Sequence, residues 1–319
     1  MLARSGSRPG GYALLAVAAA VSTLALIAVG GVVRTTESGL GCPDWPLCHG
    51  GLLPPLERAA IIEYAHRTAA SVVGLLILWV AAWTLWRRRA DRALAVLALA
   101  SLPLLAVQAW LGKEAVEREL PALIVTLHLA TGLLLFAVVT LLAALAWLGP
   151  RRRRIREPAR ERLTLVSAWA CAVTFAVLIA GSYLVGEGAG PACTGWPGCP
   201  EAPIPFLDGS RLHDAHWLHR VTVLLGGGAI AAVAWSATGL GRGAATLRGA
   251  AAALVVLYLA QVVLGAANIW TDHSAAVRTA HLALAAALWG LLVAMAVAGR
   301  FAPATPEQER AVGSGASGV

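Results

Sequence analysis

The chain has 319 residues, of which 58% are hydrophobic and only 13% are charged. So small a charged fraction excludes an ordinary soluble domain of this size and indicates a membrane protein. The formal net charge of +8 could suggest nucleic-acid binding, but the arginines lie in short segments between long apolar runs. This distribution is typical of membrane topology signals, so we expect no nucleic-acid partner.

Eight apolar stretches are long enough to span a bilayer, which takes about 20 residues per helix. In chain order they cover residues 12–33, 62–86, 93–111, 121–148, 163–186, 215–239, 246–270 and 275–299. The alternating ten-residue strands of a membrane β-barrel are absent from the sequence, which therefore predicts an all-α membrane protein with eight transmembrane helices. The first stretch is interpreted as an uncleaved helix, because no clear signal-peptide cleavage site follows it.

Arginine is concentrated on one side of these predicted helices. It clusters in the connections after the second, fourth and sixth stretches, at residues 87–92, 151–162 and 242–248. Most acidic residues lie in the other connections. The positive-inside rule then places the arginine-rich side and both termini in the cytoplasm. Residues 302–319 are rich in Pro, Gly, Ser, Ala and Glu, which predicts a disordered cytoplasmic tail.

The sequence contains an internal repeat. An offset of 153 residues aligns unusual residues of the two halves: His66-Arg67 with His219-Arg220, Gln108 with Gln261, Leu111-Gly112 with Leu264-Gly265, and Thr126–Ala130 with Thr279–Ala283. An offset of 151 residues aligns the loop segments Cys42–Cys48 and Cys193–Cys199, each with an internal Trp-Pro pair. An even number of helices per half gives both halves the same orientation. We therefore expect two pseudo-symmetric four-helix bundles in parallel repeat, residues 1–150 and 151–301.

Four of the eight histidines lie within predicted helices at repeat-related positions: His66, His128, His219 and His281. All four should lie at a similar depth, in the half of the membrane away from the arginine-rich side. An ionisable residue inside a membrane indicates function. Paired imidazoles on facing helices, without a thiolate or carboxylate to complete a tetrahedral site, favour bis-axial heme iron over zinc; interhelical hydrogen bonding is the alternative. Gln108 and Gln261 could support the histidines, or simply tie helices together.

The repeat is broken at Glu63, whose equivalent in the second half is His216. Glu63 precedes His66 by three residues, which places both side chains on one helix face. Such a carboxylate could transfer a proton or stabilise a cation at a carbon being oxidised, although a solvated or salt-bridged carboxylate is the alternative. Arg67 and Arg220 are candidates for binding heme propionates, or for reaching toward lipid headgroups. The difference between Glu63 and His216 predicts that the first half carries out the reaction and that the second holds an electron-transfer heme.

Four of the five cysteines form two pairs in the loops on the acidic side, Cys42 with Cys48 and Cys193 with Cys199. Outside the cytoplasm such pairs form disulfides, and each would close a short loop that contains Trp-Pro. A structural role and a redox-active role are both open. Zinc binding is the competing interpretation, but two cysteines alone do not complete a zinc site.

Three segments together resemble the bacterial heme A synthase family. They are Glu37–Cys48 with its Cys-Pro-Asp-Trp-Pro-Leu-Cys motif, Glu63-Tyr64-Ala65-His66-Arg67, and the stretch from Gln108 to His128. The similarity continues through His219 to His281 and so covers nearly the whole chain. Like some members of that family, the chain carries two extracytoplasmic cysteine pairs. It departs from the family pattern after Gly112, where Lys113-Glu114-Ala115-Val116 stands in place of the expected Gly and Thr before Val.

The resemblance implies a multi-pass protein of the bacterial cytoplasmic membrane that oxidises the C8 methyl of heme O to a formyl group. The reaction proceeds by successive hydroxylations and loss of water, and it supplies heme A to terminal oxidases. By the same resemblance, His66 and His128 flank the substrate heme, Glu63 is needed for activity, and His219 and His281 ligate a heme B cofactor. Both heme sites would lie toward the extracytoplasmic side.

Heme O is the expected substrate partner, alongside membrane lipid. Heme O synthase and the assembly factors of terminal oxidases are candidate protein partners, because they make the substrate and use the product. A homo-oligomer is a further candidate. A diheme cytochrome b-type electron-transfer protein is the alternative function, because it explains the histidines and the repeat but neither Glu63 nor the cysteine loops. A heme exporter or carrier is a third candidate, which the paired ligands disfavour.

Overall fold

The structure is a computed structural model that describes residues 10–149 and 152–302. Within these residues, eight helices are long and apolar enough to cross a membrane. In chain order they are α1 (Gly11–Thr35), α2 (Arg58–Arg87), α3 (Arg92–Glu117), α4 (Ala122–Leu148), α5 (Pro158–Gly186), α6 (Arg211–Thr238), α7 (Ala245–Trp270) and α8 (Ala275–Arg300). The predicted all-α membrane architecture is confirmed. Residues 303–319 of the predicted tail lie outside the described part of the chain.

The largest error in the predicted helix boundaries is at the end of α3. The apolar stretch ends at residue 111, but α3 continues to Glu117. Two ion pairs run along this extension, and the partners in each are four residues apart. They are Lys113 with Glu117 at 3.0 Å and Glu114 with Arg118 at 2.7 Å. Such pairs stabilise a helix without any apolar side chains. A prediction from hydrophobicity alone therefore ends this helix too early.

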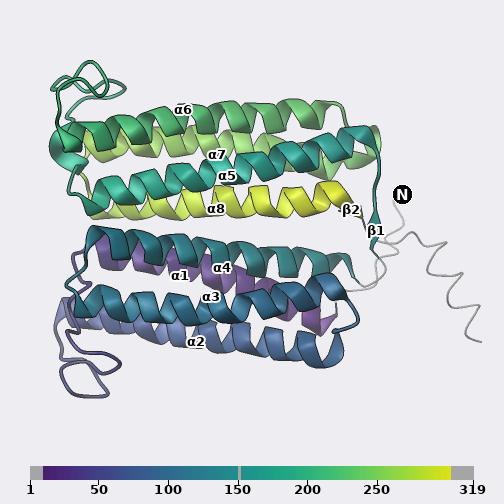
Figure 1. The fold of residues 1–319 in the computed structure, drawn as a ribbon, viewed down its shortest axis with the longest axis horizontal. Helices are drawn as coiled ribbons and strands as arrows, with labels where there is room; N and C mark the ends of the chain where they lie inside the picture. Colours follow the sequence, from purple (N-terminus) through teal and green to yellow (C-terminus); the bar gives the residue numbers. More distant parts are fainter. Residues whose placement is uncertain (1–9, 150–151, 303–319) are drawn as a thin grey trace, which may run out of the picture.

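The helices form two four-helix bundles that lie side by side, α1–α4 and α5–α8 (Figure 1). Helices α1 and α4 of the first bundle contact α8 and α5 of the second. Across this interface Thr35 and Thr279 share a hydrogen bond of 2.9 Å, and Ser182 donates to Thr126 at 3.3 Å. Thr126 and Thr279 are repeat equivalents, so the two bundles meet through corresponding positions.

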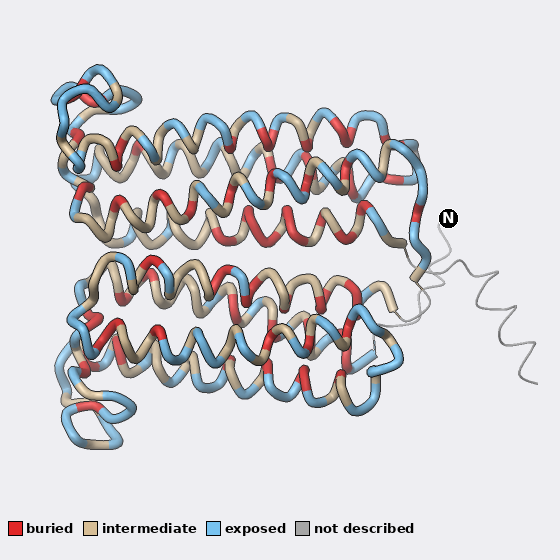
Figure 2. Tube along the Cα trace, in the orientation of Figure 1, coloured by how far each residue is buried: buried red, intermediate tan, exposed pale blue. Residues whose placement is uncertain are grey.

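The packed hydrophobic core lies in one half of each bundle. We call the end that carries residues 36–57 and 187–210 the Cys-loop end, and the end that carries residues 152–157 the linker end. The two main clusters of buried residues lie toward the linker end (Figure 2), around Tyr12, Ile77, Leu94 and Leu142 in the first bundle and around Leu163, Val233, Leu254 and Leu292 in the second. Among the described residues, no cluster of this size fills either bundle toward the Cys-loop end.

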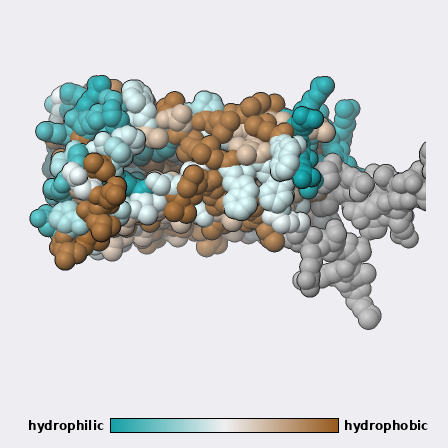
Figure 3. All heavy atoms as spheres, turned by 90° about the horizontal axis from the view of Figure 1, so that it is seen from below, coloured by the Kyte–Doolittle hydropathy of each residue, from teal (hydrophilic) through white to brown (hydrophobic). Residues whose placement is uncertain are grey.

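The outer surface is apolar between two hydrophilic ends (Figure 3). Large hydrophobic side chains in the middle of the helices are exposed, for example Leu75 at 67% and Leu224 at 75%. A soluble protein rarely exposes so extended an apolar surface, whereas a helix that satisfies its own backbone hydrogen bonds is suited to lipid. The surface therefore agrees with a multi-pass membrane protein.

The linker between the bundles is attached to both of them. Its strand β1 (Arg153–Arg154) pairs antiparallel with β2 (Phe301–Ala302), which directly follows α8. Ala302 therefore belongs to an ordered strand and not to the predicted tail. On the other side, Arg152 makes two hydrogen bonds of 2.6 and 2.7 Å to the carboxylate of Asp91, in the α2–α3 connection. The linker thus joins the α2–α3 connection of the first bundle to the strand that follows α8 of the second.

We expect Asp91→Asn to weaken this attachment. The hydrogen bonds from Arg152 hold the pKa of Asp91 below its usual value. Their stabilisation is therefore present above about pH 4, the ordinary value for Asp, and is lost as pH falls through the lowered pKa. Because solvent screens the pair, the expected loss is about 1 kcal/mol, or a few degrees in unfolding temperature.

Thermal unfolding in detergent at neutral and acidic pH measures this effect. The wild type should exceed Asp91→Asn at neutral pH, and the difference should close in acid because the asparagine does not titrate. Glu157→Gln is a matched control, since Glu157 pairs only weakly with Arg160, at 3.7 Å. A difference that is the same at both pH values would contradict the assignment.

Candidate functional site

The four helix-borne histidines lie at a similar depth from the Cys-loop end. His66 and His219 are each eight residues beyond the first residue of α2 and α6, and His128 and His281 are each six residues beyond the first residue of α4 and α8. At 1.5 Å per residue these positions are about 12 Å and about 9 Å along their helices. All four helices begin at the Cys-loop end (Figure 1), so the rings occupy the half of each bundle without a packed hydrophobic core.

The structure brings the histidines together in the two predicted pairs. His66 of α2 and His128 of α4 are close enough to interact electrostatically, and so are His219 of α6 and His281 of α8. Each pair belongs to one bundle and comes from two different helices. The rings are only partly accessible. This arrangement offers two imidazole donors in each bundle.

Several buried polar atoms near these pairs have no hydrogen-bond partner within the described residues. They are Nδ1 of His66, His128, His219 and His281, and Oε1 of Gln108 and Gln261. A buried polar atom without a partner is unfavourable. These six atoms form three repeat-related sets, so the same unsatisfied arrangement occurs in both bundles. The donor set suits heme, because two imidazoles per site are a common axial ligand set for heme iron.

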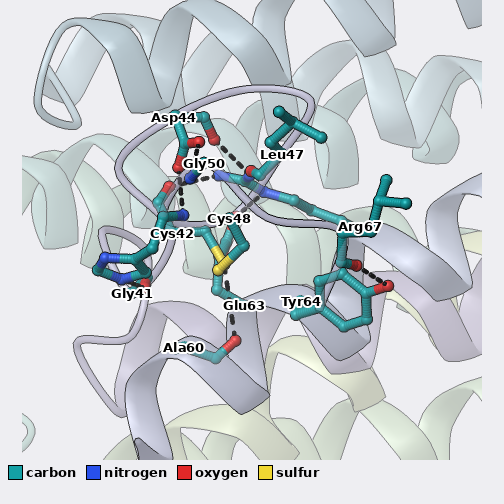
Figure 4. Close-up of a disulfide and its surroundings, with 12 residues drawn as sticks. Gly41, Cys42, Asp44, Leu47, Cys48, Gly50, Ala60, Glu63, Tyr64 and Arg67 are labelled. Atoms are coloured by element: carbon teal, nitrogen blue, oxygen red, sulfur yellow. Dashed lines mark hydrogen bonds and ion pairs between the residues drawn. A yellow bond between two sulfur atoms is a disulfide. The ribbon is translucent and has the colours of Figure 1, made fainter. Parts of the chain in front are cut away.

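Glu63 is buried, with 5% of its surface exposed, and is joined to the first Cys loop through Arg67. Its Oε1 accepts a hydrogen bond of 2.9 Å from Nε of Arg67. The same guanidinium donates to the carbonyl oxygens of Cys42 at 2.7 Å, Asp44 at 2.7 Å and Leu47 at 2.9 Å (Figure 4). A guanidinium has about five N–H donors, and Arg67 makes four hydrogen bonds within the protein. Glu63 is therefore salt-bridged, as in the alternative interpretation from the sequence, and Arg67 has little capacity left for a propionate.

Arg220 has the same role in the second bundle. It donates to the carbonyl oxygens of Gly195 at 2.8 Å and Pro197 at 3.1 Å, both in the second Cys loop. Both arginines proposed for propionates therefore hold a Cys loop against the helix that carries the histidine before them. The sequence contained a signal for this role, because the His-Arg pair and the Cys-x-x-Trp-Pro-x-Cys loop recur together in both halves.

Both predicted disulfides are confirmed, Cys42 with Cys48 and Cys193 with Cys199. The sulfur atoms of Cys193 and Cys199 lie near a carboxylate oxygen of Glu201, which superficially resembles a metal site. Because the two sulfurs are bonded to one another, they are not free thiolates for zinc. The zinc interpretation is therefore wrong for these pairs.

Asp44 organises the first Cys loop from within. Its carboxylate accepts hydrogen bonds from the backbone N–H groups of Gly50 at 2.7 Å and His49 at 2.6 Å. These contacts, the one from Gly50 foremost, hold the pKa of Asp44 below its ordinary value. Tyr64 of α2 donates to the carbonyl of Leu52 at 2.8 Å and fixes the far side of the loop. These hydrogen bonds hold the loop beside Glu63.

The two bundles differ in what surrounds their histidines. In the first, the amide of Gln108 hydrogen-bonds to ring Nε2 of His128 at 3.2 Å. In the second, the amide of Gln261 donates instead to the main-chain carbonyl of His281 at 2.9 Å and makes no hydrogen bond to the ring. His216, which replaces Glu63, shares a hydrogen bond of 2.9 Å with the carbonyl of Gly190. The second site thus has a histidine tied to a loop where the first has a carboxylate.

The chain is similar to proteins of one family along nearly its whole length. Residues 13–293 match the COX15-CtaA family, described as cytochrome oxidase assembly protein. The heme A synthase of Symbiobacterium thermophilum is 34% identical over 289 residues, which cover 88% of this chain and 93% of that protein. The heme A synthase of Alkalihalophilus pseudofirmus is 31% identical over 66% of this chain and 72% of its own length. That of Exiguobacterium sibiricum is 32% identical over 57% and 61%.

Proposed function

The chain belongs to the COX15-CtaA family of cytochrome oxidase assembly proteins, and on that premise we propose that it oxidises the C8 methyl of heme O to the formyl group of heme A. The observation that carries this proposal is the asymmetry of two otherwise matching histidine sites. Glu63 is buried beside the first pair, and its equivalent in the second half is His216. An enzyme with one reactive heme and one auxiliary heme needs a difference of this kind.

We assign the substrate to the first bundle and the cofactor to the second. His66 and His128 would hold the substrate heme, and His219 and His281 would hold heme B. The ring of His281 has no side-chain partner within the described residues, which suits a permanent ligand. The ring of His128 has an alternative partner in Gln108, which suits a site that must bind and release its heme. A bound heme B supplies one-electron transfer.

Glu63 is the proposed catalytic base. Conversion of the methyl group to a hydroxymethyl group with the oxygen of water releases two electrons and two protons. The electrons would pass one at a time to heme B held by the second bundle, and a carboxylate within a water-poor site is suited to accept a proton. Arg67 fixes Oε1 of Glu63, while Oε2 has no hydrogen bond within the described residues and is free to receive a proton. The hydrogen bonds from Arg67 to the first Cys loop orient the carboxylate, and the loop limits access of water.

We further propose that the Cys-loop end faces the extracytoplasmic side of a bacterial membrane. The linker end carries the arginine clusters around residues 87–92 and 152–162, which favours the cytoplasm. The two disulfides lie at the opposite end, and such bonds persist in oxidising compartments. Helix α1 begins and strand β2 ends at the linker end (Figure 1), so both termini would be cytoplasmic.

Heme extraction from the purified protein, followed by mass analysis, tests the proposed function. We expect heme B together with heme O, a hydroxylated intermediate or heme A. Heme B alone would favour the diheme cytochrome b-type alternative. A protein that carries no heme after expression in cells that make heme O would contradict the assignment of both histidine pairs.

A further inference from the structure

Each paired histidine packs its ring against a glycine of the preceding helix. A Cβ atom placed on the glycine would lie close to ring Cε1: 3.3 Å for Gly30 and His66, 3.2 Å for Gly112 and His128, 2.9 Å for Gly181 and His219, and 3.4 Å for Gly265 and His281. The contact recurs between α1 and α2, α3 and α4, α5 and α6, and α7 and α8. At the tightest of these positions no residue larger than glycine fits without movement of the ring.

The four glycines are related by the same internal repeat as the histidines. Gly30 and Gly181 differ by the offset of 151 residues that aligns the Cys loops, and Gly112 and Gly265 by the offset of 153 residues that aligns the histidines. Each bundle therefore contains two glycine–histidine contacts in corresponding places. A chance packing contact would not be expected to recur at all four histidines.

The buried Nδ1 atoms of these rings indicate what the contact achieves. None has a hydrogen-bond partner within the described residues. Backbone carbonyl groups lie within electrostatic reach of three rings: Gln108 for His128, Val177 for His219 and Gln261 for His281. Each of these residues precedes the packing glycine by four positions. Its carbonyl is the one that accepts the glycine N–H inside the helix, and it retains a second lone pair.

A side chain at the glycine position would hold the imidazole away from this carbonyl. With glycine, the ring lies against the helix backbone and can direct its Nδ1–H toward the second lone pair. Such a hydrogen bond would keep the proton on Nδ1 and leave the lone pair of Nε2 for a metal. Ligating histidines are commonly oriented by a hydrogen bond of this kind to a backbone carbonyl.

We propose that Gly30, Gly112, Gly181 and Gly265 are positioning residues that orient the four histidines, and that Gly112, Gly181 and Gly265 also select the tautomer of theirs. The inference rests on the proposed function for the identity of the ligand, but its geometry is a property of the protein chain alone. The glycines act through the histidines and do not themselves contact a reacting atom.

Gly181→Ala is the sharpest test, because its added Cβ would lie 2.9 Å from His219. We expect the affinity for heme B to fall by roughly 10- to 100-fold, the usual effect of lost support for a metal ligand, and the low-spin spectrum to change. Gly265→Ala should have a smaller effect, because 3.4 Å is close to ordinary contact. Gly228→Ala, in α6 with nothing within 4 Å, is the matched control. A folded Gly181→Ala protein with unchanged heme B affinity and spectrum would overturn the proposal.

A second readout separates this inference from the proposed function. In heme-free protein labelled with ¹⁵N-histidine, the ring signals of His219, identified by their absence in His219→Gln, should shift in Gly181→Ala and not in Gly228→Ala. If Gly181→Ala does not fold, Gly112→Ala provides the same test on His128, with heme B binding retained. Unchanged ring signals would overturn the role of the glycines. Failure of the wild type to bind heme B would overturn the proposed function instead.

Discussion

Replacement of Glu63 by Gln should leave heme B bound and stop the formation of heme A. Glutamine has nearly the same shape, so the buried position remains filled, and its amide oxygen can still accept the hydrogen bond from Arg67. It cannot accept a proton at neutral pH. Loss of a general base typically slows a reaction by about 10²- to 10⁴-fold. Heme extraction from cells that make heme O should show heme O accumulating while the heme B content equals that of the wild type.

A second carboxylate provides a matched control for this variant. Glu114 also lies at the Cys-loop end and also pairs with an arginine four residues later, Arg118 at 2.7 Å. Glu114→Gln removes the same charge from the same pair spacing, although its partner Arg118 is mostly exposed, and it should retain heme A formation. If Glu63→Gln made heme A at the wild-type rate, Glu63 would have no part in the chemistry. Its ion pair with Arg67 would then serve only to hold the first Cys loop.

The number, order and approximate bounds of the helices could be predicted because hydrophobicity determines which segments enter a membrane. The prediction was wrong where another interaction sustains a helix. At the end of α3 the charged residues of 113–118 pair along the helix surface, and no hydrophobic signal marks them. The strand pairing of Arg153–Arg154 with Phe301–Ala302 was also not foreseen, because two residues are too short to give a periodic pattern.

The histidine pairs could be predicted because the repeat places a histidine at the same two helix positions in both halves. It does not identify the atoms that they contact. The sequence leaves a propionate and lipid headgroups open as partners of Arg67, yet the structure directs it to three loop carbonyls and Glu63. Likewise, the match of Gly112 with Gly265 was visible in the repeat, but its packing against a ring from the next helix was not. Contacts between helices depend on their relative rotation, which sequence spacing alone does not provide.

Replacement of His219 or His281 by Ala should abolish the low-spin heme B spectrum. The two rings belong to one bundle and interact across α6 and α8, and each would supply one axial ligand. Loss of either would remove one of the two imidazoles that hold the heme iron, which would change its spin state and weaken retention of the heme. Optical spectra of the purified variants, with heme content per protein, measure the effect. His66→Ala and His128→Ala should keep the heme B spectrum and lose heme A formation.

His273 provides the control for a general effect of removing a histidine. It lies in the α7–α8 connection near Gly190 and is outside both pairs, so His273→Ala should retain both the spectrum and the activity. Circular dichroism separates loss of heme from loss of the fold in each variant. A wild-type heme B spectrum in His219→Ala would show that the cofactor is not held by the second bundle. If His66→Ala or His128→Ala lost that spectrum instead, the roles of the two bundles would have to be exchanged, and Glu63 would lie beside the cofactor and not beside the substrate.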